Sequence, residues 1–321
     1  MSQRNYALDA LKLILACCIV ALHFNWKIIP RGYLSVEFFF VISGFLLYKT
    51  QGYLKYNPLN AIKRVYPVYL VSIITIIFFS SQSYDMLSIF LSFLILQSIG
   101  LNDTVVNVPS WFLCVYLISM PFIAYLIKRT VNNKALLLGT CALISIFSYS
   151  MLYLHTPSKG FNYSFEFKVL GITVGLWRCW AGICLGVLAG LLSEVEDKLN
   201  LVKATVLEIS LLVFFIIVFC FSGWSPDYDF VSLPMIVLSV VILSKRSGLI
   251  AKYMDLAFRR LRIPASLSTN IFLLHFPVIM VMSEADAGHY QKFYIACAFM
   301  FTCVVMILNI KGAGRPPQRT M

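Results

Sequence analysis

Charged residues are scarce in this 321-residue sequence, which has only 14 acidic residues and a total charged content of 12%. A water-soluble domain carries about a quarter of its residues as charged side chains. Hydrophobic residues reach 60% and aromatic residues 15%, which also excludes a disordered or acidic tail protein. The composition therefore excludes a water-soluble enzyme and predicts a protein that crosses a membrane several times.

Paired cysteines and metal-ligand spacings are also missing. The nine cysteines lie within apolar stretches, and none stands at a metal-type spacing from one of the four histidines. Buried cysteine behaves as a small hydrophobic residue, so we expect no disulfide framework and no metal site. A cleavable signal peptide is not expected either. The first apolar run contains Asp9, Lys12 and His23 and lacks a small-residue cleavage pattern, so we interpret it as a retained first span.

Apolar segments long enough to be considered as membrane spans run through most of the chain. A hydrocarbon core of about 30 Å needs about 20 helical residues. The segments are 7–26, 33–49, 67–81, 84–99, 110–127, 135–154, 169–192, 204–222, 230–244, 265–283 and 293–310. We find no repeat, low-complexity tract or appended soluble region. The predicted fold is an all-α, polytopic membrane helical bundle that forms one domain, with a core at 6–310 and a short basic tail at 311–321.

Basic residues predict which loops face the cytoplasm. The net charge is +12, and most Lys and Arg residues gather in 49–66, 128–134, 245–263 and the tail. Cytoplasmic loops carry such an excess, so these regions must be separated by even numbers of crossings. Three segments lie between the first two, and we expect 67–81 or 84–99 to be broken or re-entrant. This gives about ten crossings in the cell inner membrane, with both termini cytoplasmic and no need for a nucleic-acid partner.

Five ionisable residues fall at membrane depth, where a charged side chain is costly and is a functional hypothesis by default. They are Lys12, His23, Glu37, Arg178 and His275. Lys12 and His23 are about three helical turns apart, near one helix face and about 16 Å apart along the axis. Structural alternatives remain open: Lys12 can snorkel to the inner interface, His23 and Glu37 can lie at the outer interface, and His275 can be a hydrogen-bonded core histidine.

Motifs around these residues resemble the integral-membrane acyltransferase 3 family, the O-acyltransferases of bacterial surface polysaccharides. Leu8-Asp9-Ala10-Leu11-Lys12 is similar to the family's LDxLR opening, and Lys12-x10-His23 to its hallmark of a basic residue, ten residues and His. Residues 32–45, GYLSVEFFFVISGF, resemble GxxGVdxFFvxSGF and place Glu37 at the acidic position. The resemblance covers roughly residues 6–283.

Later stretches resemble further family motifs in the family's order, and at two positions the residue type differs from the family's pattern. RVYPVY at 64–69, Trp177-Arg178 with Gly182 and Gly186, and STNIFLLHFP at 268–277 resemble further family motifs. Lys12 replaces the usual Arg, which keeps the charge and loses the planar fork for bidentate phosphate binding. Tyr116, in WFLCVY at 111–116, stands where many relatives carry Glu.

The resemblance implies transfer of an acyl group, most often acetyl, from cytoplasmic acyl-CoA to a hydroxyl of a surface glycan or its lipid-linked precursor. His23 is the candidate general base or acyl relay, and Glu37 and His275 are further catalytic candidates. Lys12, Arg64 and Arg178 are the candidates for binding acetyl-CoA; Arg178 and Glu37 have the alternatives of lining the acceptor side or forming a structural pair. The expected partners are acyl-CoA, a glycan acceptor and membrane lipids.

Two other functions compete with acyl transfer. A transporter or flippase of a lipid-linked sugar shares intramembrane charges and broken helices, but the two halves of this sequence show no matching Gly- or Pro-broken pair. A purely structural membrane partner is disfavoured by the five intramembrane ionisable residues. Ser43-Gly44 is predicted to allow close helix packing rather than to supply a nucleophile. The basic loops are explained mostly by membrane orientation, with Arg64 as the exception.

Overall fold

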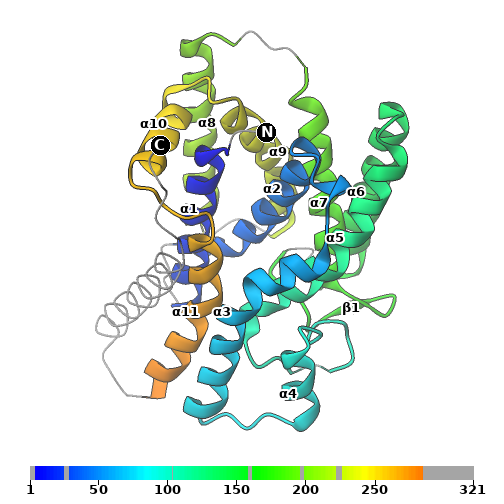
Figure 1. Ribbon diagram of the computed structural model, residues 1–321, viewed down its shortest axis with the longest axis vertical. Helices are drawn as coiled ribbons and strands as arrows, with labels where there is room; N and C mark the ends of the chain where they lie inside the picture. Colours follow the sequence, from blue (N-terminus) through cyan, green and yellow to red (C-terminus); the bar gives the residue numbers. More distant parts are fainter. Residues whose placement is uncertain are drawn as a thin grey trace, which may run out of the picture.

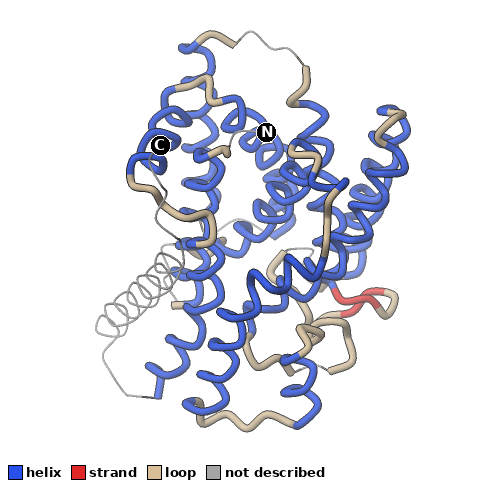
Figure 2. The backbone as a smooth tube through the Cα atoms, viewed as in Figure 1, coloured by secondary structure: helices blue, strands red, loops and turns tan. Residues whose placement is uncertain are grey.

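The protein is an all-α bundle, as the sequence predicts. The computed structural model describes residues 4–24, 29–102, 104–157, 161–195, 199–221 and 226–284, and the predicted segment 293–310 and the tail at 311–321 lie outside these ranges. The elements are α1 Tyr6–His23, α2 Ser35–Lys49, α3 Pro58–Phe79, α4 Met86–Phe93, α5 Trp111–Thr130, α6 Lys134–His155, β1 Lys168–Val169, β2 Ile172–Thr173, α7 Val174–Leu192, α8 Leu201–Cys220, α9 Ser232–Lys245, α10 Leu249–Arg260 and α11 Leu267–Glu284 (Figures 1 and 2).

Eight helices in the described ranges are long and apolar enough to cross a membrane. They are Tyr6–His23, Gly32–Lys49, Pro58–Phe79, Val108–Thr130, Lys134–His155, Val174–Leu192, Leu201–Cys220 and Tyr228–Lys245. Leu267–Met280, within α11, is a shorter apolar helix. Large side chains on several of these helices are exposed, Phe78 by 77% and Leu143 by 70%, as expected for surfaces that face lipid. The count of ten crossings stays a prediction.

The irregular member of the pair 67–81 and 84–99 is the second segment. α3 continues unbroken through Pro67 to Phe79, whereas α4 has eight residues, far fewer than the about 20 that a span needs. Asp85 caps α4, because its carboxylate accepts the Ser88 N–H at 2.7 Å and the Ser88 hydroxyl at 2.8 Å. Ile95, at φ 59°, then turns the chain soon after the helix ends.

Three boundaries differ from the sequence prediction. The predicted loop 49–66 ends early because α3 begins at Pro58, with Asn57 as its N-cap, so Arg64 lies on a helix. Most of 245–263 forms α10 rather than a loop. The predicted span 169–192 opens with the hairpin β1–β2, and α7 begins only at Val174. Leu170 and Gly171 have φ values of 53° and 77°, which suit a tight two-residue hairpin turn.

α7 lies at the centre of the bundle, where α2, α5, α6 and α9 pack on it. The α2–α7 contact is the most extensive, and glycines make it possible. Gly182, Gly186 and Gly190 recur every four residues on α7, and an added Cβ on each would collide with α2. Gly44 of α2 meets the backbone of Ile183 in the same way. The predicted close packing at Gly44 is therefore present, and small residues spaced by four are typical of such helix pairs.

α1, α3 and α11 form a second group beside this core. α11 packs on both α1 and α3, and α10 packs on α1 (Figure 1). The N-terminal half of α1 therefore contacts α10, while its C-terminal end reaches α11. This arrangement separates the two ends of α1, which carry Lys12 and His23.

Replacing Gly186 with Ala should destabilise the protein, because the new methyl group would meet the Val41 carbonyl and the backbone of α2. Overpacking of a tight contact costs about 1–3 kcal/mol. Gly139→Ala in α6 is the matched control, since nothing lies within 4 Å of a Cβ added there and Ala is the better helix former. Thermal unfolding of the detergent-solubilised variants should show a lower Tm for Gly186→Ala alone. Equal Tm values would contradict the packing argument.

Candidate active site

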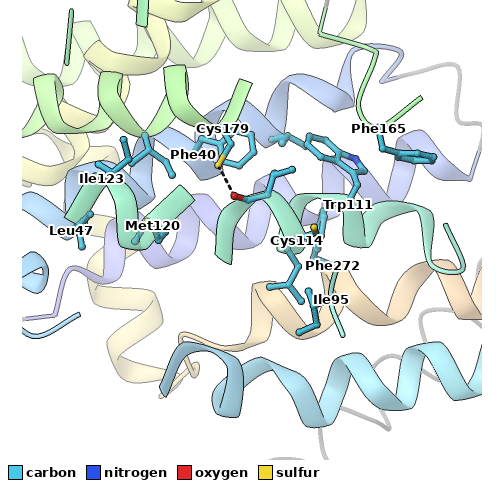
Figure 3. Close-up of a cluster of buried hydrophobic side chains, with 14 of the residues drawn as sticks. Phe40, Leu47, Ile95, Trp111, Cys114, Met120, Ile123, Phe165, Cys179 and Phe272 are labelled. Carbon is cyan, nitrogen blue, oxygen red and sulfur yellow. Dashed lines mark hydrogen bonds between the residues drawn. The ribbon is translucent and has the colours of Figure 1, made fainter. Parts of the chain in front are cut away.

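A cavity of about 390 Å³ lies between the central helices and the second group. His23 enters it from the end of α1, Arg178 from α7, Trp111 from α5 and Phe272 from α11. The segment that follows α6 closes another side with Phe161 and with polar groups of 162–166. Figure 3 shows Trp111 and Phe272 within one cluster of buried hydrophobic side chains. The cavity thus combines aromatic walls with a few ionisable groups, as ligand sites commonly do.

His23 and His275 lie side by side although 252 positions separate them in the sequence. Their ring centroids are 5.2 Å apart and their planes are tilted by 36°. Phe276 packs edge-on against His23 at 5.9 Å. The contact between α1 and α11 brings the two imidazoles together, so the final turn of the first helix and the middle of the last described helix build one site.

His275 has a defined tautomer. Its Nδ1 atom lies 2.7 Å from the Phe272 carbonyl oxygen, and because a carbonyl only accepts hydrogen bonds, Nδ1 must carry a proton. In the neutral ring, Nε2 then keeps a lone pair. Nε2 is buried and has no hydrogen-bond partner among the described residues. The site therefore holds a free basic nitrogen on the ring next to His23.

Glu37 and Arg178 form a buried ion pair between α2 and α7. Arg178 Nε donates to Glu37 Oε1 at 2.7 Å, and the two side chains are 2% and 0% exposed. Tyr149 of α6 donates its hydroxyl to Glu37 Oε2 at 3.0 Å. Arg178 Nη1 donates to the Tyr163 carbonyl at 2.7 Å. A buried pair of charges needs such additional hydrogen bonds to offset the loss of water, and here α6 and the segment that follows it provide them.

One nitrogen of Arg178 remains free. Nη2 is buried and has no hydrogen-bond partner in the described part of the chain, although a buried guanidinium normally uses its donors. The guanidinium lies 5.0 Å from the Trp111 ring centroid and 5.7 Å from that of Phe161, and all three residues line the cavity. An N–H donor is thus held in place at the cavity that contains His23.

Lys12 and Arg64 lie away from this cavity, so the structure divides the six predicted site residues. Lys12 pairs with Asp9 at 2.6 Å, and Arg4 pairs with the other oxygen of the same carboxylate at 2.6 Å. Arg64 is exposed near the start of α3. The other four form two pairs, His23 with His275 and Glu37 with Arg178, and one member of each pair, His23 and Arg178, lines the cavity. Within the described ranges, no set of three or more His, Cys, Asp or Glu side chains is placed to hold a metal ion.

Sequence reasoning missed the residues that hold the charged group in place. Tyr149, Trp111 and Phe161 contact Glu37 or Arg178, but aromatic residues are too common in this chain to stand out.

Tyr116, which replaces the acid of many relatives, stacks on Phe112 at a centroid distance of 5.8 Å. Phe112 in turn stacks on Phe40 at 4.8 Å. Tyr116, at the position where the family pattern has an acid, is therefore part of an aromatic stack.

Glu37→Gln should destabilise the protein strongly, because it leaves the Arg178 charge buried without its partner. Breaking a buried pair in this way costs about 3–5 kcal/mol. Glu194→Gln is the matched control: Glu194 pairs with Lys134 at 2.8 Å, with side chains 35% and 68% exposed, and this hydrogen bond lowers the pKa of the Glu194 carboxyl. An exposed pair contributes about 0–1 kcal/mol. Unfolding in detergent should separate the two variants; equal losses would contradict a buried pair.

One of three comparisons with known proteins identifies a family. The family model described as an acyltransferase domain, Acyl_transf_3, matches residues 5–310, which include every residue of the cavity and of the ion pair. Neither a curated protein nor a solved structure matches the chain. Because this family model covers nearly the whole length of the chain, it identifies the family to which the chain belongs. The long apolar helices indicate that the protein lies in a membrane. The chain therefore belongs to the acyltransferase 3 family and is a membrane acyltransferase.

Proposed function

We propose that the protein transfers an acetyl group from cytoplasmic acetyl-CoA to a hydroxyl of a cell-surface glycan or its lipid-linked precursor, in the cell inner membrane with both termini cytoplasmic. The observation that carries the proposal is the shared cavity of His23 and Arg178. One supplies an imidazole that can accept a proton, and the other supplies a fixed N–H donor that has no hydrogen-bond partner among the described residues. Acyl transfer to a hydroxyl needs both functions.

His23 acts as general base in the proposed reaction. It removes the proton from the acceptor hydroxyl while the hydroxyl oxygen attacks the thioester carbonyl carbon. The developing oxyanion accepts a hydrogen bond from Arg178 Nη2, in a buried setting where such a bond is strong. Collapse of the intermediate breaks the carbon–sulfur bond, and the departing CoA thiolate takes the proton back from His23. Glu37 keeps the guanidinium in position, and His275 supports the His23 ring.

An acyl relay is the second form of the same proposal. In that form the His23 imidazole attacks the thioester carbonyl, the carbon–sulfur bond breaks, and the departing CoA thiolate takes the ring proton of His23. The acceptor hydroxyl then attacks the acyl-imidazole, and the Nε2 atom of His275 takes the hydroxyl proton and returns it to His23 as the acyl group leaves. Isolation of an acylated His23 after mixing with donor alone would select this form.

The donor phosphates are assigned to the end of α1 that carries Lys12. Arg4 and Lys12 share the single carboxylate of Asp9, so this trio keeps one net positive charge. Arg64 is exposed on α3 and adds a second cation for a polyanionic ligand. Lys12 and His23 are about 16 Å apart along the helix, so an extended pantetheine arm would join the phosphates at one end to the thioester at the other.

His23→Ala should abolish acetyl transfer while the protein stays folded, because His23 is half-buried at the end of a helix and its loss opens little space. General-base catalysis contributes about 10²–10⁴-fold. His155→Ala is the control, since His155 is exposed at the end of α6. Reconstituted vesicles with labelled acetyl-CoA and candidate glycans provide the assay. Substantial activity in folded His23→Ala protein would overturn the assignment.

Lys12→Ala should weaken acetyl-CoA binding to the solubilised protein by about 10- to 100-fold, the expected loss of one charge-assisted contact. Lys12→Arg should restore binding, because it keeps the charge and adds the fork that suits phosphate. Lys203→Ala, an exposed position on α8, should leave affinity unchanged. Absence of acetyl-CoA binding in the unmodified protein would instead favour a flippase, which has no use for CoA.

A further inference from the structure

A second cavity lies on another face of α1, away from the candidate active site. It has a volume of about 240 Å³ and is enclosed by α1, α8, α9 and α10, with Phe38 of α2 at one side. α1 contributes Leu11, Leu15 and Cys18, which follow the spacing of one helix face. Its walls are almost wholly apolar. Neither His23 nor Arg178 belongs to this lining.

Glu208 is the ionisable residue in this apolar wall, and the fold provides a place for its carboxylate. Its Oε2 atom accepts the N–H of Ile250 at 2.8 Å and that of Ala251 at 3.4 Å, at the start of α10. Gly248 is the N-cap of α10, and a Cβ there would collide with the Glu208 carboxylate. The Glu208 carboxylate, which belongs to α8, therefore caps the N-terminus of α10, the end of a helix at which negative charge is favourable.

The other carboxylate oxygen of Glu208 differs from the first in having no hydrogen-bond partner in the described part of the chain. The residue is 3% exposed, and Oε1 is buried without a hydrogen bond from any described residue. Ser239, another polar residue of the wall, does not satisfy Oε1, because its hydroxyl donates to the Met235 carbonyl of its own helix at 2.8 Å. A buried carboxylate oxygen without a hydrogen bond lowers the stability of the folded state, and a ligand that donates a hydrogen bond to it would remove this cost.

The mouth of the cavity opens toward the bilayer. Ile14, Leu212 and Ile216 line it and are 53%, 50% and 54% exposed, on helices that are candidate membrane spans. A ligand that enters between such side chains comes from the hydrocarbon region, where water-soluble molecules are rare. The occupant therefore needs an apolar chain for the walls and a hydrogen-bond donor for Glu208.

We propose that this cavity binds a membrane lipid with a primary ammonium head group, such as phosphatidylethanolamine. One acyl chain fills the space between α1 and α8, and the ammonium donates to Glu208 Oε1. Charge complementarity selects this head group: an ammonium offers both an N–H and the charge opposite to the carboxylate, whereas a head group whose only charge is its phosphate is repelled. This site is separate from acyl transfer and does not depend on it.

Lipid in this site would also support α1. In the middle of α10, Asp255 accepts the N–H of Tyr6, the first residue of α1, at 3.2 Å. Asp255 is held in turn by Arg259 at 2.6 Å and by Arg246 at 3.2 Å. A lipid that stabilises the start of α10 therefore stabilises the helix that fixes the beginning of α1, whose other end carries His23.

The test compares three lipids on the delipidated protein in detergent: dioleoyl phosphatidylethanolamine, phosphatidylglycerol and phosphatidylcholine. A ligand specific for the native state raises the Tm, and the ethanolamine lipid should raise it by about 2–5 °C more than the other two. Phosphatidylcholine carries a cation without an N–H, so it separates hydrogen bonding from charge alone. Equal shifts with all three lipids would overturn the proposal without any variant.

Two variants locate the effect. Glu208→Gln should remove the preference for the ethanolamine lipid, because its amide can no longer attract an ammonium. Ser239→Leu should remove the response by filling the cavity. Ser210→Leu is the matched control: the Ser210 hydroxyl donates to the Val206 carbonyl of its own helix in the same way, at 2.9 Å, and Ser210 is exposed outside the cavity. An ethanolamine preference that persists in either cavity variant would refute the site. Native mass spectrometry of the unmodified protein gives the same comparison if a variant fails to fold.

Discussion

The buried ion pair between Glu37 and Arg178 is the interaction on which the rest of this bundle depends. Inside a mostly apolar protein, each of these charges is tolerable only beside the other. Their contact requires α2 and α7 to approach closely, and the glycines of α7 allow that approach. The same pair recruits Tyr149 and the carbonyl of Tyr163. Packing, charge balance and the position of a free N–H donor are therefore consequences of one arrangement.

The two ends of α1 differ in chemistry because they contact different helices. The first turns lie within a network of charges, in which Asp9 holds Arg4 and Lys12 while Asp255 of α10 accepts the N–H of Tyr6. The last turn lies against α11, where His23 meets His275 and Phe276. A single straight helix thus connects a polar, basic end to an aromatic cavity, which is the geometry expected for a long substrate with a charged head and a reactive tip.

Sequence alone identified the ionisable members of the site because charge is expensive at membrane depth. Glu37, Arg178, His23 and His275 each stood out, and the structure places them in two pairs, Glu37 with Arg178 and His23 with His275, with one member of each pair at the same cavity. Their catalytic roles stay a prediction. Their partners could not be found in this way, because a tyrosine such as Tyr149 has no unusual local pattern and pairing is set by tertiary structure. Charge counting placed the irregular segment in the pair 67–81 and 84–99, and the structure shows that it is the second. The same count treated 245–263 as a basic loop and so did not reveal α10.

The ion pair also has a consequence for how the protein is made. Glu37 and Arg178 are 141 positions apart, and at about 5–20 residues per second the ribosome needs roughly 7–28 s to travel between them. For that interval α2 has left the ribosome while the only described cation that satisfies its carboxylate does not yet exist. The contact between α2 and α7 therefore cannot form until α7 has been synthesised, so the packing of α2 is completed late in synthesis.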